Sequence, residues 1–181
     1  MEVTWYFRLF YLPILNMIIG FLLAFGLKAK RMGGPEGGKA VLIGSAISML
    51  VFIALGWFVT FSINLTFWIG LAIIVLGHVV FALCCAAMRE HPEKKKTVVD
   101  WGIFKVTRHP HVISGMITSL GVIVVGWNWS SIMYIILWIY FVLDVGFNHF
   151  YILVEEKRNI EKFGQEYLDY MKMVPRYFLV K

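Results

Sequence analysis

The fold of this chain is decided by residues 129–154, which read WSSIMYIILWIYFVLDVGFNHFYILV and lead directly into Glu155 and Glu156. A helix needs about 20 apolar residues to cross roughly 30 Å of hydrocarbon, and this stretch exceeds that length. Its one acidic residue is Asp144, about ten residues before the end of the run. The stretch therefore predicts a membrane-spanning helix with a carboxylate inside the bilayer.

Four further apolar runs predict four more spanning helices, at residues 9–27, 41–62, 65–88 and 112–127. The composition agrees, because 60 % of the 181 residues are hydrophobic and 15 % are charged. A soluble domain is nearer half apolar and a quarter charged, and a disordered chain has few aromatic residues. The two cysteines, Cys84 and Cys85, are adjacent and exclude a disulfide framework. We expect an all-α integral membrane protein with five transmembrane helices.

The basic residues predict how these helices are oriented. All of the seventeen except Arg8 lie in residues 28–39, 89–108 and 157–181, which five spans place on one side of the membrane. By the positive-inside rule that side is cytoplasmic, so we expect the N-terminus outside and an amphipathic C-terminal tail in the cytosol. The membrane is either a prokaryotic plasma membrane or the endoplasmic reticulum. The net charge of +6 is dispersed along membrane-proximal segments and favours lipid headgroups, not nucleic acid, as partner.

A polar stripe follows the last predicted helix. Asp144, Asn148, Tyr151 and Glu155 recur at helical spacing and share nearly one face. Ionisable residues inside a membrane are costly and usually functional, so the stripe is interpreted as the wall of a water-accessible pocket. A helix–helix hydrogen bond from Asp144 is an equal alternative. The pair Glu155-Glu156 is either part of that site or simply solvated.

The segment Arg108-His109-Pro110 opens the fourth predicted helix. Pro110 suits the first helical turn, where its missing N–H is not needed. The free N–H groups of a helix N-terminus and the guanidinium of Arg108 suit an anionic group such as a carboxylate or phosphate. His109 and His111 flank the proline and have no third ligand nearby in sequence, so no metal site is expected. His78, alone in a span, is expected to be structural.

The last eighty residues carry an ordered set of short motifs. They are Gly102-Ile103-Phe104, Arg108-His109-Pro110, Glu155-Glu156, Phe163-Gly164-Gln165-Glu166-Tyr167, Tyr170 and Val174-Pro175-Arg176. Together they resemble the isoprenylcysteine carboxyl methyltransferase and phospholipid methyltransferase superfamily of membrane enzymes, over residues 97–178. The sequence departs from that pattern at Val112, Ser114 and Tyr151. Carboxyl-methylating members tend to have arginine at the last of these positions.

The resemblance implies S-adenosylmethionine as cofactor, with S-adenosylhomocysteine as product. Carried over onto this sequence, the residues that it implies for cofactor binding are Gly102, Phe104, Arg108, His109, Pro110, Glu155 and Glu156. The chemistry agrees, because Arg108 suits the carboxylate of the cofactor and either glutamate suits its ammonium or hydroxyl groups. For the reacting centre we expect Asp144, Glu155 and Tyr151, and the proton acceptor, if one is needed, remains open among Asp144, Glu155 and His149.

We therefore expect a membrane methyltransferase that acts on a lipid-like or small hydrophobic acceptor: an isoprenylcysteine carboxylate, a phospholipid amine or a thiol. Residues 1–96 would form a transmembrane scaffold and residues 97–181 the catalytic part of one structural unit. Two alternatives stay open: an NADPH-dependent membrane reductase of the sterol reductase type, and a non-catalytic lipid-binding protein. The sequence leaves the acceptor and the oligomeric state open.

Overall fold

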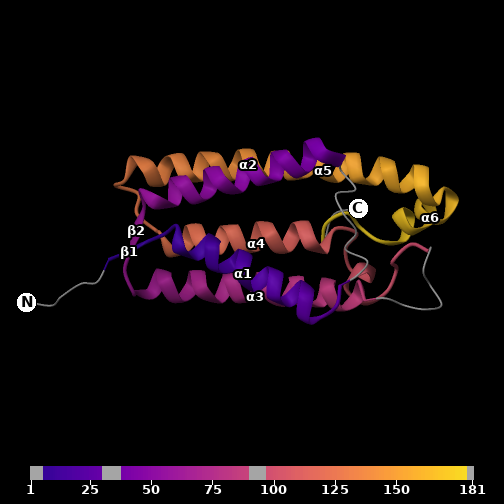
Figure 1. Ribbon diagram of the computed structural model, residues 1–181, viewed down its shortest axis with the longest axis horizontal. Coiled ribbons are helices and arrows are strands. Elements are labelled where there is room, and N and C mark those ends of the chain that lie inside the picture. Colours follow the sequence, from indigo (N-terminus) through magenta and orange to yellow (C-terminus); the bar gives the residue numbers. More distant parts are fainter. Residues whose placement is uncertain (1–5, 30–37, 90–96, 179–181) are drawn as a thin grey trace, which may run out of the picture.

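The protein is mostly helical in the computed structural model, which describes residues 6–29, 38–89 and 97–178 (Figure 1). The elements in chain order are β1 (Phe7–Arg8), α1 (Tyr11–Gly26), α2 (Gly38–Trp57), β2 (Thr60–Phe61), α3 (Leu65–Ala87), the 3₁₀ helix η1 (Gly102–Lys105), α4 (Pro110–Val125), α5 (Ile132–Phe163) and α6 (Gln165–Met173). Each of the five predicted apolar runs thus contains most of one helix from α1 to α5.

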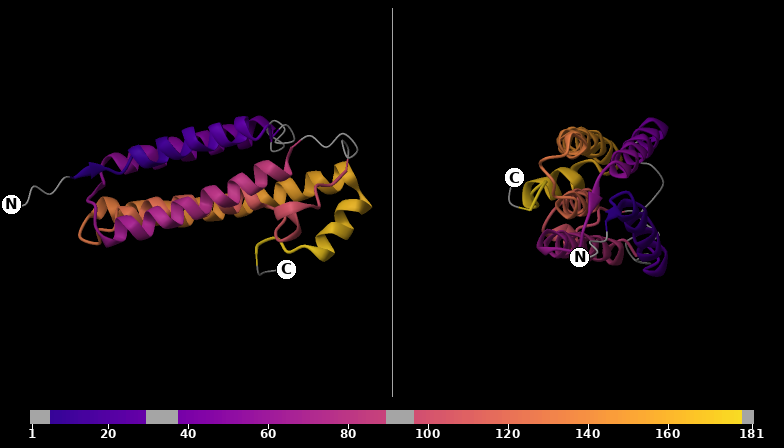
Figure 2. Two further views of the ribbon diagram at one scale, coloured as in Figure 1. Left: turned by 90° about the horizontal axis from the view of Figure 1, so that it is seen from below. Right: turned by 90° about the vertical axis from the view of Figure 1, so that its left-hand side faces the viewer.

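The helices α1 to α5 lie along the long axis of the molecule (Figures 1 and 2). The closest pairing is α3 with α4, while α2 packs on α5 and α1 contacts both α2 and α3. The short antiparallel pair β1–β2, in which Phe7 faces Phe61, lies at one end, and α6 lies at the other. This two-residue ladder is a small departure from the all-α expectation, and it ties the start of α1 to the turn before α3.

Local sequence explains where the helices begin and end. The Asn64 side chain caps α3 by accepting the Phe67 N–H at 3.0 Å, and Ser131 caps α5 through the Tyr134 N–H. The apolar run that ends at residue 154 does not end α5, because the charged residues after it are good helix formers. The helix continues to Phe163 and stops at Gly164, whose φ is +58°.

The surface of the bundle is strongly apolar. On α1 the side chains of Leu22 and Phe25 are 60 % and 77 % exposed, and on α5 that of Leu143 is 67 % exposed. Within the described residues two helices, α3 and α5, are long and apolar enough to cross a membrane, while α1, α4 and Ala46–Trp57 of α2 are shorter apolar helices. The structure thus supports a helical membrane protein, and the number of crossings stays a prediction.

Only some of the basic residues that predict the orientation of the helices lie within the described residues. Arg8 lies on β1, at the opposite end of the bundle from α6, which carries Lys172. Lys30, Arg31 and Lys94–Lys96, which contribute to the predicted orientation, lie outside the described residues.

The contact between α3 and α4 depends on glycine. A Cβ built at Gly70 would lie 2.7 Å from the backbone oxygen of Gly121, and one at Gly121 would lie 2.8 Å from the backbone oxygen of Gly70. A Cβ at Gly77 would lie 3.0 Å from the backbone of both Ser114 and Thr118. Small residues of this kind let two helices approach closely where lipid supplies no hydrophobic driving force between them.

We predict that Gly77→Ala destabilises the protein by about 1–3 kcal/mol, because the added methyl group would force the two backbones apart. Gly146→Ala on α5 is the matched control, since a Cβ there meets nothing within 4 Å. Thermal unfolding in detergent checks the difference, and the intrinsic gain in helix propensity is common to both variants. Equal melting temperatures would show that the α3–α4 contact tolerates a side chain at this position.

Candidate functional site

The segment before α4 is folded against the end of α3. Gly102 has φ of +60° and a built Cβ would lie 3.1 Å from that of Ala87, so both the backbone conformation and the close approach require glycine. The indole of Trp101 donates to the Ala87 carbonyl at 2.9 Å. Phe104 is buried in a cluster with Cys84 and Ala87. These contacts fix the position from which the chain enters Thr107, Arg108 and His109.

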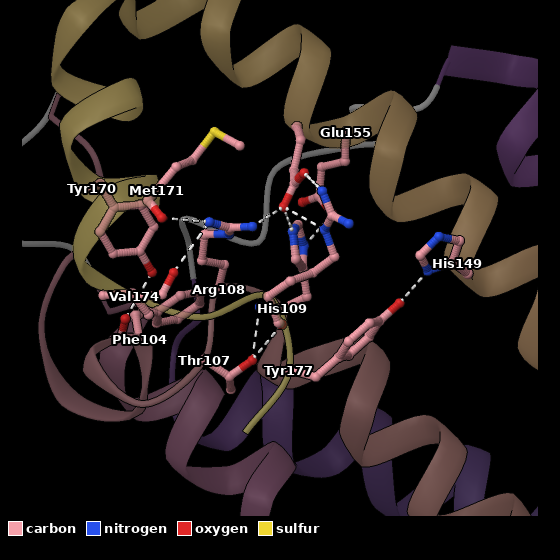
Figure 3. Close-up of polar contacts among 12 residues, drawn as sticks. Phe104, Thr107, Arg108, His109, His149, Glu155, Tyr170, Met171, Val174 and Tyr177 are labelled. Carbon is pink, nitrogen blue, oxygen red and sulfur yellow. Dashed lines mark hydrogen bonds and ion pairs between the residues drawn. The ribbon is translucent and has the colours of Figure 1, made fainter. Parts of the chain in front are cut away.

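Arg108 connects this segment to the C-terminal residues. Its Nη1 donates to the backbone carbonyls of Met171 and Val174, at 2.9 and 3.1 Å, and its backbone N–H donates to the carbonyl of Pro175 (Figure 3). Its Nη2 lies 2.9 Å from Glu156 Oε1. The Tyr170 hydroxyl donates to the Phe104 carbonyl beside it. The guanidinium therefore holds the residues after α6 against the start of α4.

Glu156 is the centre of the charged cluster. Besides Arg108 it receives Arg176, whose Nη2 lies 2.6 Å from Oε2 and whose Nε donates to Oε1 at 3.1 Å. The Glu156 side chain is only 5 % exposed. Its two oxygens contact two guanidinium groups and the ring of His109. A buried carboxylate is tolerable only with such partners.

His109 lies between the two glutamates. Its Nδ1 is 3.0 Å from Glu155 Oε2 and its Nε2 is 3.2 Å from Glu156 Oε1. Carboxylate oxygens accept hydrogen bonds, so both ring nitrogens act as donors when the imidazole is protonated. Burial lowers the pKa of His109, but the hydrogen bonds to Glu155 and Glu156 outweigh burial and raise that pKa above its ordinary 6.5. The imidazolium is the form that this geometry favours.

A cavity of about 580 Å³ adjoins this cluster inside the helical bundle. Its wall contains residues from all five long helices, and most of them are apolar or aromatic. The polar ones are Asn16, Ser48, His78, His111, Ser114, Thr118, Ser119, Tyr140, Asp144, Asn148 and Tyr151. His111 joins the two regions, because it lines the cavity while its Nε2 lies 3.9 Å from Glu155 Oε2.

Asp144 sits in the cavity wall among neutral partners. Ser48 donates to its Oδ1 at 2.5 Å and Asn148 donates to its Oδ2 at 3.0 Å. The Tyr140 hydroxyl contacts both the hydroxyl and the carbonyl of Ser48. The two interpretations of Asp144 therefore coexist: it makes a hydrogen bond to α2 and also faces a cavity.

The predicted site residues divide into three groups. Asp144 and Tyr151 line the cavity, with the Tyr151 ring 6.4 Å from that of His111. Arg108, His109, Glu155 and Glu156 form the charged cluster. Gly102, Phe104 and Pro110 support it, since Phe104 packs on α3 and Pro110 is buried in the first turn of α4. The roles assigned to all of them stay predictions.

Three residues of the site have no assigned role in the sequence analysis. Arg176 stands in the quoted Val174-Pro175-Arg176, which gives no hint that it reaches Glu156. His111 is considered only as a metal ligand. Ser48 carries no signal at all, because a lone serine in an apolar run fits any spanning helix. His149 is not among the described residues that line the cavity, and its ring contacts the Tyr177 hydroxyl at 2.6 Å (Figure 3).

Comparison with known proteins identifies a family that this chain matches. The family model described as a protein of unknown function (DUF1295) matches residues 5–174, nearly the whole chain. No curated protein and no solved structure matches significantly.

We predict that Glu156→Gln destabilises the protein by about 3–5 kcal/mol, because it leaves the guanidinium of Arg108 buried without a counter-charge and leaves His109 with Glu155 alone. Glu161→Gln is the matched control, since Glu161 is exposed on the same helix. Thermal unfolding in detergent checks the difference between them. If the two variants melt together, Glu156 does not hold the cluster.

The charge state of His109 predicts how stability depends on pH. A group whose pKa is raised by folding contributes stability that is fully present below its unfolded pKa and lost as pH rises through the folded value. The advantage of the wild type over His109→Gln should therefore be largest below pH 6.5 and shrink at higher pH. Melting temperatures of both proteins across this range check it. A constant difference would contradict a charged His109.

Proposed function

This chain belongs to the DUF1295 family, and we propose that it is an integral membrane methyltransferase that uses S-adenosylmethionine. In this proposal α1 to α5 all cross the bilayer, the N-terminus is outside, and the charged cluster faces the cytosol. The methyl acceptor is a lipid-like or hydrophobic molecule that enters the cavity from the membrane.

The observation that carries the proposal is the junction of a charged cluster with a cavity inside an apolar bundle. Glu155 is 12 % exposed and lies 3.9 Å from His111, which lines the cavity. A water-soluble, charged cofactor and a membrane-dissolved acceptor need such a junction, because each approaches from a different solvent. Bringing two reactants together in one orientation is the main requirement for a direct group transfer.

The charged residues fit the cofactor in their chemistry. S-adenosylmethionine carries a carboxylate, an ammonium, a sulfonium and ribose hydroxyls, and it supplies an activated methyl group when bound. Among the described residues the buried Nε of Arg108 has no hydrogen-bond acceptor, and a carboxylate oxygen would provide one. Glu155 suits the ammonium or hydroxyl groups. The Tyr151 ring on the cavity side suits a cation such as the sulfonium.

The other residues would act by positioning. Glu156 holds Arg108 and Arg176, and His109 holds Glu155, so the groups that meet the cofactor are fixed before it binds. The apolar wall of the cavity would keep water from the reacting atoms.

A reductase remains the second candidate. The DUF1295 family is commonly related to steroid 5-alpha-reductase-like membrane proteins. Such an enzyme would bind the phosphates of NADPH with basic residues. In this structure Arg108 and Arg176 are both paired with Glu156, so the one unpartnered donor of Arg108, its Nε, suits a single carboxylate better than the several phosphate charges of NADPH. We therefore favour the methyltransferase.

We predict that the purified protein binds S-adenosylhomocysteine and not NADPH in calorimetric titrations. Glu155→Gln should weaken the binding by about tenfold or more, because a charge-assisted hydrogen bond is lost. Glu161→Gln, on the same helix and exposed, should bind as the wild type does. Transfer of a labelled methyl group from S-adenosylmethionine to a membrane lipid extract then tests turnover. Binding of NADPH alone would replace this proposal with the reductase.

A further inference from the structure

The cavity has a charge of its own, separate from the cluster at its end. Asp144 is the one acidic residue in its wall, and none of the described residues that line it is lysine or arginine. The partners of the Asp144 carboxylate are the neutral Ser48 and Asn148. Among the described residues no basic side chain forms an ion pair with Asp144. Within the described part of the chain the carboxylate is thus held by neutral groups, and no positively charged side chain is in contact with it.

The histidines in the wall do not supply that counter-charge in this arrangement. His78 Nδ1 lies 2.9 Å from the Ile74 carbonyl on its own helix, and His111 is 3.9 Å from Glu155 Oε2, the nearer carboxylate. Asp144 is seven residues before Tyr151 on α5, so roughly 10 Å of helix separates it from the end of the cavity where His111 and Tyr151 lie.

A carboxylate in a low-dielectric cavity selects among ligands by charge. It repels an anionic head group and attracts a cation, and the effect is stronger than in water because the surroundings screen less. The apolar residues of the wall, among them Met17, Phe52, Phe81 and Phe147, suit a hydrocarbon tail. The combination matches an amphiphile with a basic nitrogen at its head.

From these observations we propose that the cavity binds a membrane-dissolved amine, held as a cation by Asp144, and that this amine is the methyl acceptor. For transfer the ammonium gives a proton to the Asp144 carboxylate, the freed nitrogen lone pair forms the new N–C bond as the methyl–sulfur bond of S-adenosylmethionine breaks, and S-adenosylhomocysteine leaves. The first part depends only on the cavity, whereas the acceptor role rests on the proposed methyltransferase function. The proposal disfavours the carboxylate among the three acceptor classes that the sequence left open, because a carboxylate would face Asp144 with no basic group to offset the repulsion. It also gives the Asp144–Asn148 pair a role in recognition.

The test compares three probes with the same tail: dodecylamine, dodecanol and dodecanoate. The wild type is placed in phosphatidylcholine nanodiscs, and its melting temperature is followed as each probe is added, since a ligand that binds only the folded state raises it. We expect dodecylamine to reach half of its effect at a concentration about tenfold or more below that of dodecanol, and dodecanoate to have the weakest effect.

Variants assign the preference to Asp144. Asp144→Asn should bind the amine and the alcohol equally, while Asp144→Glu, which keeps the charge, should retain the preference. Asp169→Asn makes the same chemical change on α6, outside the cavity, and should behave as the wild type does. All variants share one lipid composition, so partitioning of the probe into the bilayer is common to them. If Asp144→Asn does not fold, the wild type still tests whether the amine is preferred over the alcohol, and loss of that preference in Asp144→Glu would contradict the role of the charge.

Equal effects of the amine and the alcohol on the wild type would overturn the proposal, as would an amine preference that survives in Asp144→Asn. S-adenosylhomocysteine binding and methyl transfer to dodecylamine are measured on the same preparation. An Asp144-dependent amine preference without cofactor binding would remove the methyltransferase function and leave the cavity's selectivity standing. Cofactor binding with no amine preference would remove the proposed selectivity of the cavity and leave the methyltransferase function standing.

Discussion

The buried carboxylate of Glu156 is the interaction on which the functional end of this molecule depends. It receives Arg108 from the segment before α4, Arg176 from the residues after α6, and His109 from the start of α4. Two parts of the chain that are distant in sequence, residues 108–109 and Arg176, therefore meet on one side chain of α5. Removing one partner from such a cluster leaves the others charged and buried, so its members form a unit rather than a set of independent ion pairs.

The position of this cluster follows from the cost of charge in a membrane. Burying a guanidinium or a carboxylate in hydrocarbon has a large free-energy cost, and this cost is smaller where water is near. Glu155 and Glu156 come directly after the apolar part of α5, while Asp144 lies deeper and is stabilised by neutral groups instead. The bundle thus separates two polar environments, a charged cluster at its end and a weakly polar cavity inside it, joined at His111 and Glu155.

The packing of the helices makes this separation possible, because α3 and α4 pack closely against each other while a cavity lies between them and the other long helices. The glycines of α3 and α4 bring those two helices together, whereas α1, α2 and α5 contact them less extensively. The cavity lies between these two groups of helices and takes wall residues from all five. An acceptor held there would be oriented by the apolar wall and by Asp144, and a cofactor would be held by the charged cluster.

The sequence by itself determined where the helices lie along the chain and which polar residues share a helix face or stand at a helix start, because apolar runs, caps and helical spacing are local properties. It predicted five apolar helices, the stripe from Asp144 to Glu155, and the segment Arg108-His109-Pro110 at a helix start. It did not give the end of α5 at Gly164 or the β1–β2 pair, since charged residues can extend a helix and strand pairing is not local. Only the tertiary structure decided that Arg176 reaches Glu156, that Ser48 holds Asp144, and that His111 joins the cavity to the cluster. Those contacts link residues tens of positions apart, and their partners are set by how the helices pack, which no periodicity in the sequence records.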